Sequence, residues 1–266
     1  MNFFEELIKY FTDMGVSRGV AIVYLIVSAL IVVMAIVALV MRIMVMVKYY
    51  QGNNMQTKSG KTSFEVAREA LDKAGLEHIK VETANFFRAF FFGNSYSITK
   101  KTIFLRRSIA NKDSITAVGL ALQKVGVAKM CEEGDVKAKS RNVLSILNIF
   151  APVLFIPVVA VGFVLDFLLL GNFGIFSVIS IVLGVFLILT GFIVTLLNIP
   201  VEKKANEVAL KIIDETQVLD EEERKVIVKV FDAYIIAYIC EFILAVLRLV
   251  QYILEIVMKF QIRNKD

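Results

Sequence analysis

The sequence predicts a mainly α-helical, multi-pass membrane protein with three to four transmembrane helices and a small polar α+β unit. Hydrophobic residues make up 58% of the 266 positions, whereas ordinary soluble domains contain about 45–50%. Long apolar stretches carry almost no charge, and the charged residues, 21% of the chain, gather between them. This segregation excludes disordered, fibrous and disulfide-stapled proteins and indicates a bilayer-embedded protein with a water-exposed part.

The apolar and polar stretches divide the chain into eight segments. These are an N-terminal segment (1–18), a first transmembrane helix (19–47), a polar α+β unit (48–142), a second (143–170) and a third (171–199) transmembrane helix, polar helices (200–230), a polar-striped C-terminal membrane helix (231–260) and a tail (261–266). The net charge of +5 suits contact with anionic lipid. No basic tract or RNA-binding signature predicts a nucleic-acid partner.

The first apolar stretch, residues 19–41, contains no charged residue. As a helix it would be roughly 34 Å long, which is enough to cross a hydrocarbon core of about 30 Å. The stretch is longer than a signal-peptide core and is followed by Arg42 and Lys48. We therefore expect it to be retained as a transmembrane helix.

The second and third apolar stretches are joined by a very short link at Gly171, which predicts an antiparallel helical hairpin. Pro152 and Pro157 predict kinks in the second helix, and Asp166 is expected to reach the membrane interface near its outer end. The hairpin puts both polar segments on one side of the bilayer. Their basic excess predicts a cell-membrane protein whose large loop is cytoplasmic.

The polar unit has clear local signals. Thr62 and Glu65 form a capping-box pattern at a helix start, and Gly75 is placed to end that helix. Residues 79–82, 95–98 and 102–106 are candidate strands, and 113–130 is a candidate helix. Residues 201–217 and 221–230 are expected to form two further helices, the second capped by Asp220.

Five phenylalanines within eight positions form an unusual cluster in the polar unit. The predicted interaction surface consists of Phe86, Phe87, Phe90, Phe91 and Phe92. One interpretation is burial against the domain core or the membrane surface. The other is a loop that dips into the membrane or contacts a protein partner.

The last apolar stretch carries Glu241, Arg248 and Glu255 at seven-residue intervals, which places them on one helix face. Such a stripe is costly in contact with lipid and must face protein, water or the interface. The alternatives are a helix whose polar side is satisfied within the bundle and a functional polar cavity. The same three residues are candidate interaction residues.

The residues available for chemistry are few. The chain has one histidine, His78, and two cysteines, Cys131 and Cys240. A zinc site built on two histidines is therefore impossible within one chain. The cysteines lie in dissimilar segments and are interpreted as reduced and structural.

Several motifs, taken in order, are similar to those of one known family. They are Thr62-Ser63-Phe64-Glu65-Val66-Ala67-Arg68, the hairpin around Tyr96 with Lys101-Thr102-Ile103, Ser114-Ile115-Thr116-Ala117-Val118-Gly119-Leu120-Ala121, and Pro200-Val201-Glu202 with Ala205. Across roughly residues 59–255 the chain resembles the bacterial YugP-type membrane zinc metallopeptidases. The resemblance implies a zincin-like α+β unit, a zinc cofactor for the family, and Glu202 at the third-ligand motif.

The chain departs from this family at the catalytic helix. Where the family has H-E-x-G-H, this sequence has Gln123-Lys124-Val125-Gly126-Val127. In the family motif two histidines bind Zn²⁺ and the glutamate activates its water. The residues at the degenerate active-site positions are thus Gln123, Lys124, Val127 and Glu202, and they predict no catalytic residue and no bound metal. We expect Lys124 to form an ion pair with Glu202 and so to replace the lost metal charge.

The predicted function is that of a pseudopeptidase, a non-catalytic homologue that acts as partner, scaffold or regulator in a membrane complex. The predicted partners are the lipid bilayer and either another membrane protein or a second copy of this chain. One alternative is an active zinc peptidase with unorthodox ligands, drawn from His78, Cys131 and Glu202, and another is a Ser–Lys hydrolase that uses Lys124. A further alternative is a structural or transport-accessory component.

Overall fold

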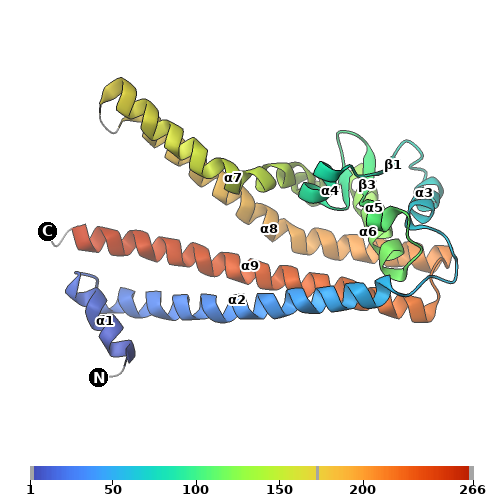
Figure 1. The fold of residues 1–266 in the computed structure, drawn as a ribbon, viewed down its shortest axis with the longest axis horizontal. Coiled ribbons are helices and arrows are strands. Elements are labelled where there is room, and N and C mark those ends of the chain that lie inside the picture. Colours follow the sequence, from blue (N-terminus) through green and yellow to red (C-terminus); the bar gives the residue numbers. More distant parts are fainter. Residues whose placement is uncertain (1–2, 172–173, 264–266) are drawn as a thin grey trace. The chain divides into compact units, whose positions relative to one another are not determined.

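The computed structural model describes residues 3–171 and 174–263. Within these ranges the chain is mainly helical, with a three-stranded sheet, as the sequence predicts. The elements are α1 (Phe3–Asp13), α2 (Arg18–Asn53), α3 (Ser63–Lys73), β1 (Lys80–Thr83), α4 (Phe86–Phe92), β2 (Ser95–Ser97), β3 (Thr102–Leu105), α5 (Arg107–Ala110), α6 (Ile115–Glu132), α7 (Val136–Leu170), α8 (Ile175–Thr216) and α9 (Glu221–Arg263). Figure 1 shows them coloured along the chain.

Three of these helices, α2, α8 and α9, are long and apolar enough to cross a membrane. In α7, the described part from Ile156 to Leu170 is a shorter apolar stretch. Large apolar side chains along these helices are exposed, as expected for surfaces that a bilayer would cover. By length and composition, the described chain therefore has three helices of the predicted membrane-spanning kind.

The chain forms two compact units. One comprises Met1–Met44 with Ile236–Asp266, and the other comprises Val45–Ile235. The larger unit holds the sheet, α3 to α8 and the candidate site. The smaller unit pairs the first part of α2 with the last part of α9.

The sheet of the larger unit has the order β1-β3-β2. Strand β1 runs parallel to β3, with Val81 opposite Ile103, and β2 runs antiparallel to β3, with Tyr96 opposite Ile103. All three side chains are buried and belong to the hydrophobic core of this unit. The three strands lie within two residues of the predicted positions.

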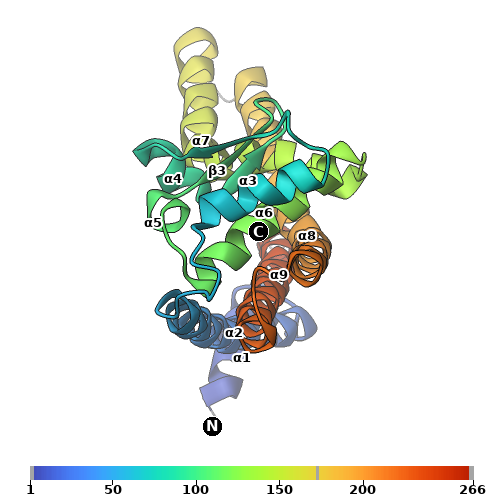
Figure 2. The same ribbon diagram turned by 90° about the vertical axis from the view of Figure 1, so that its right-hand side faces the viewer.

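Helix α6 lies at the centre of the larger unit. Of its 18 residues only Lys124, Lys129 and Glu132 are not buried. It packs against α3, the sheet and α8, and Figure 2 shows α3 in front of it. The Ser114 hydroxyl caps its start by accepting the backbone N–H of Ala117 at 3.3 Å. A helix buried on all sides explains why α6 lacks an amphipathic pattern.

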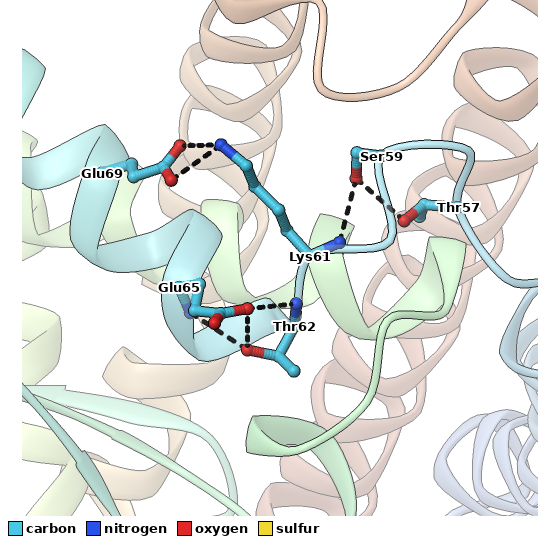
Figure 3. Close-up of polar contacts among 6 residues, drawn as sticks. All are labelled: Thr57, Ser59, Lys61, Thr62, Glu65 and Glu69. Carbon is cyan, nitrogen blue, oxygen red and sulfur yellow. Dashed lines mark hydrogen bonds and ion pairs between the residues drawn. The ribbon is translucent and has the colours of Figure 1, made fainter.

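The start of α3 has the predicted capping box. The Glu65 carboxylate accepts the backbone N–H of Thr62 at 2.8 Å, and the Thr62 hydroxyl accepts the N–H of Glu65 at 3.4 Å (Figure 3). Lys61 adds a hydrogen-bonded ion pair to Glu69, with both N–O distances at 2.7 Å. Gly75 follows the helix with φ of 69°, a left-handed conformation that glycine adopts without strain.

Helices α7 and α8 form the predicted antiparallel hairpin and run side by side in Figure 1. They approach closely at Gly162, where a Cβ atom would lie 2.1 Å from the Ser180 hydroxyl oxygen. Helix α7 is continuous through Pro157. The side chain of Pro152, where a kink is also predicted, lies outside the described set.

Asp166 lies near the tip of the hairpin, and its side chain is buried by protein rather than exposed. Its carboxylate accepts the backbone N–H groups of Gly174, Phe176 and Ser177 at 2.7–3.1 Å. The carboxylate therefore caps the start of α8, where the helix leaves N–H groups without partners. It holds the tip of the hairpin together.

The polar helices expected after the third and before the fourth apolar stretch are parts of longer helices. Helix α8 continues through Pro200 to Thr216, and α9 runs unbroken from Glu221. The Asp220 carboxylate caps α9 as predicted, accepting the N–H groups of Glu222 and Glu223 at 2.9 Å. The change from apolar to polar residues marks where the surroundings of a helix change. It does not mark where the helix ends.

Candidate functional site

The candidate site lies where α6 crosses α8 in the larger unit. The backbones approach closely because Gly126 has no side chain: a Cβ atom there would lie 2.7 Å from the carbonyl oxygen of Ala205. Three residues before Gly126 is Gln123, and three residues before Ala205 is Glu202. The crossing therefore brings the positions that resemble the family's metal ligands to one place.

Glu202 is the centre of a buried ion-pair network. Its side chain is only 2% exposed. The Lys124 Nζ lies 3.6 Å from Glu202 Oε1, which is the ion pair predicted from the sequence. The Arg141 guanidinium, from the start of α7, donates a hydrogen bond to the same oxygen. Two cations from two helices thus share one carboxylate.

Amides on α8 complete the network. Arg141 Nε donates to the Asn198 side-chain oxygen at 3.0 Å, and Gln123 Nε2 donates to that of Asn206 at 2.6 Å. Asn198, Glu202 and Asn206 follow one another at four-residue spacing, so they share one face of α8. The polar groups of the site are paired with one another.

The electrostatics of the site oppose an added cation. Burial lowers the pKa of the Lys124 ammonium, and the nearby Arg141 lowers it further, while Glu202 raises it. Counted as formal charges, the two cations and one carboxylate give the site an excess of one positive charge. Burial is tolerated because each charge has a partner of opposite sign.

The residues at this site do not fit a zinc ion. Catalytic zinc takes three protein ligands of nitrogen, sulfur or carboxylate type plus a water molecule. Here Gln123 offers only a neutral amide, whose nitrogen donates to Asn206, Val127 has no ligand atom, and Glu202 is already paired with two cations. Within residues 3–171 and 174–263, no group of three histidine, cysteine, aspartate or glutamate side chains could hold a metal.

The residues considered for an alternative metal site have other partners. His78 is half exposed, as expected for a surface histidine, and its Nε2 lies 3.3 Å from Glu132 Oε2. The Tyr96 hydroxyl donates to Glu132 Oε1 at 2.8 Å. Cys131 is buried, and this burial raises the pKa of its thiol to about 11.

The phenylalanine cluster forms a helix, α4, rather than a loop. The Asn85 side chain caps it by accepting the backbone N–H of Arg88 at 2.9 Å. None of its seven residues is buried. Sequence analysis missed this helix because five aromatic residues lower its helix propensity.

The polar stripe of α9 faces α2 within the smaller unit. Arg42 Nη2 lies 3.1 Å from Glu241 Oε1, and the Tyr24 hydroxyl lies 3.5 Å from Glu255 Oε1. Arg248 lines a cleft of about 360 Å³ beside Arg42 and Glu241. Among the residues that the structure describes, none forms a hydrogen bond or ion pair with Arg248. The stripe is thus partly paired with protein, and it belongs to a different unit from the Glu202 network.

Three members of the Glu202 network were not predicted, namely Arg141, Asn198 and Asn206. Arg141 is the last charged residue before the second apolar stretch, and its position alone gave no sign of a buried partner. Asn206 could have been found, because it stands four residues after Glu202 and so on the same helix face. The repeat of polar residues at 198, 202 and 206 was the available signal.

One known family matches most of the chain. A family model described as "Putative neutral zinc metallopeptidase" matches residues 26–257. No curated protein and no solved structure matches the chain. The match covers most of the sequence, including α6, α7 and α8 with the Glu202 network. The chain therefore belongs to the putative neutral zinc metallopeptidase family.

Proposed function

We propose that this protein is a pseudopeptidase, a non-catalytic member of its family that acts as partner, scaffold or regulator in a membrane complex. One observation supports this most strongly: the Glu202 carboxylate is neutralised by Lys124 and Arg141 rather than left available to a metal. The chain would lie in the cell membrane with its larger polar segment in the cytoplasm. Its companion would be another membrane protein or a second copy of this chain.

The physical argument rests on what a buried carboxylate requires. A glutamate at 2% exposure needs a counter-charge, which zinc would supply in a catalytic member of the family. Here two side-chain cations supply it, and the general-base position is taken by one of them, Lys124. An ammonium whose charge is tied to Glu202 cannot activate a water molecule as a carboxylate does.

Metal content tests this proposal. We would measure zinc per chain by mass spectrometry on detergent-solubilised protein, purified without added zinc and without a metal-binding tag. The expected result is far less than one zinc per chain. Stoichiometric zinc that is lost in Glu202→Ala and kept in Glu207→Ala, an exposed glutamate of the same helix, would overturn the proposal.

A gain-of-site variant tests whether these positions correspond to the family's site. The triple substitution Gln123→His, Lys124→Glu and Val127→His restores both histidines and the carboxylate. It is expected to bind zinc that the natural protein does not bind, because positions 123 and 127 share one face of α6. A folded triple variant without zinc would contradict the assignment.

A second candidate function is that of a structural or transport-accessory component. It is favoured by Arg248, which lies on α9, a helix able to span a membrane, and lines a cleft beside that helix. Among the described residues, Arg248 has no ion-pair partner. Charged residues in such helices are costly and are commonly functional. If a stable co-purifying partner is retained differently by Arg248→Ala than by the natural protein, and Lys259→Ala on the same helix shows no such change, an assembly role is supported.

A further inference from the structure

Helix α4 presents a row of phenylalanine rings to the surface of the larger unit. Phe86, Phe87, Phe90 and Phe91 are 78%, 73%, 70% and 43% exposed. The rings contact one another: the centroids of Phe86 and Phe90 are 6.4 Å apart, and those of Phe90 and Phe91 are 5.1 Å apart. Isolated apolar residues are normal on a protein surface, but a contiguous aromatic patch marks an interaction site.

The opposite side of α4 is attached to the sheet. The Arg88 guanidinium lies 3.6 Å from the centroid of the Phe104 ring. Arg106 Nε donates a hydrogen bond to the carbonyl oxygen of Ala89 at 3.1 Å, and its backbone N–H donates to Asn94 at 2.7 Å. These contacts fix the helix so that its aromatic side faces outward.

The aromatic patch continues onto helix α7. The ring centroids of Phe91 and Phe150 lie 6.0 Å apart. Phe150 itself is 40% exposed, and Ile146 and Val143, one and two turns before it, are also exposed. In Figures 1 and 2, α4 lies next to this part of α7.

The depth of Phe150 on α7 identifies what covers this surface. No charged residue occurs between Arg141 and Asp166. Phe150 stands nine residues into this stretch, or roughly 13 Å along a helix. A ring that contacts Phe150 is therefore at the level where α7 has already entered apolar surroundings.

The charges near α4 suit the same surroundings. Arg106 and Arg107 follow β3 and are exposed. Basic residues at the edge of an apolar surface are attracted to anionic headgroups, while aromatic rings pass below them. A short helix with aromatic residues on one side and arginines at its base has the features of an interfacial membrane helix.

We infer that α4 is an interfacial helix whose phenylalanine side chains insert into the cytoplasmic leaflet beside α7. Insertion removes the four exposed rings from water, which is favourable. It also fixes the sheet and α6 against the membrane surface, because Arg88 and Arg106 hold α4 to the sheet. The Glu202 network would then lie close to the bilayer.

The chain contains no tryptophan, so a single introduced tryptophan reports on one position. We would reconstitute Phe87→Trp into vesicles with brominated acyl chains, which quench tryptophan only when it is in the hydrocarbon region. Leu154→Trp in the apolar part of α7 is the positive control. Lys73→Trp, on the exposed side of α3, is the negative control.

The emission of Phe87→Trp is expected to shift to shorter wavelength and to be quenched to about half or more of the extent seen for Leu154→Trp. Lys73→Trp is expected to be unaffected. Quenching of Leu154→Trp without quenching of Phe87→Trp would overturn the inference and leave the patch to a protein partner. The thermal unfolding midpoint of each variant confirms that the fold is retained.

Discussion

Gly126 of α6 packs directly against the backbone carbonyl of Ala205 in α8. Because glycine has no side chain, this contact sets the distance between the two helices. A Cβ atom at Gly126 would lie 2.7 Å from that oxygen and 3.3 Å from the Cβ atom of Val208. Backbone atoms cannot move aside as a flexible side chain can. The close approach in turn brings Lys124 within ion-pair distance of Glu202.

Gly126→Ala is therefore expected to destabilise the protein. The added methyl group forces the helices apart, and overpacking of this kind costs about 1–3 kcal/mol. The free energy of unfolding in detergent measures the effect. Gly19→Ala is the matched control, because no atom lies within 4 Å of the added Cβ in α2. It is expected to change stability by less than about 0.5 kcal/mol, and equal losses in both variants would contradict the explanation.

Removing the carboxylate of the network should cost more than removing one cation. Glu202→Gln leaves Lys124 and Arg141 buried without a counter-charge, and breaking a buried pair in this way costs about 3–5 kcal/mol. Lys124→Met is expected to cost less, because Arg141 still neutralises Glu202. Chemical unfolding of both single variants gives the order.

A double variant separates pairing from packing. Lys124→Met combined with Glu202→Gln removes the charges of both residues, so its loss is expected to be smaller than the sum of the two single losses by about 1 kcal/mol or more. Strict additivity would mean that Lys124 and Glu202 do not interact energetically. The matched control is the pair Lys124→Met with Glu207→Gln, which is expected to be additive.

The start of α7 should give the protein a specific acid dependence. The Asp135 carboxylate accepts from Lys204 Nζ at 2.6 Å and caps α7 by accepting the N–H of Ala138 at 2.9 Å. The hydrogen bond from Lys204, followed by the capping bond, lowers the pKa of Asp135 below its usual 3.8. At pH values between the lowered pKa and the usual one, Asp135 therefore binds fewer protons in the folded state than in the unfolded state. The resulting stability is present above the usual pKa and is lost as the pH falls through the lowered one.

Asp135→Asn tests this dependence while keeping an oxygen that can cap the helix. At pH 7 the variant is expected to be less stable by no more than about 1 kcal/mol, because Lys204 is half exposed and solvent screens the pair. The difference should shrink as the pH falls below about 4. Glu133→Gln, at a more exposed acid nearby, should follow the natural protein over the whole range. A constant difference at all pH values would contradict the assignment.

Local sequence signals predicted much of the larger unit. The capping box at Thr62, the cap at Asp220 and the three strands depend on neighbouring residues, so they can be read from short segments. The ion pair between Lys124 and Glu202 was also predictable, because a gained cation opposite a retained carboxylate implies pairing. The caps and strands require no knowledge of how distant segments pack, whereas the ion pair was predicted from the family resemblance, which places Lys124 and Glu202 at one site.

Other features depend on tertiary contacts that no local pattern contains. Arg141 joins the network only because α7 starts beside α8, and Asp166 caps a helix that begins beyond the hairpin link. The unbroken course of α8 past Pro200 also follows from packing, since a proline costs one hydrogen bond that a long packed helix can lose. The sequence predicts a segment boundary at Pro200 because the residues change from apolar to polar there.

Arg248 allows the two proposed roles of the α9 stripe to be separated. A guanidinium in the apolar part of a membrane helix costs about 2.5–3.5 kcal/mol on insertion scales, and no described residue offsets it with an ion pair. Arg248→Leu is therefore expected to leave the isolated protein as stable as the natural protein or more stable, as measured by unfolding in detergent micelles. Glu241→Leu, which removes the partner of Arg42, should not give this gain. A loss of stability in Arg248→Leu would show that the arginine is satisfied within the chain, and would argue against its use in assembly.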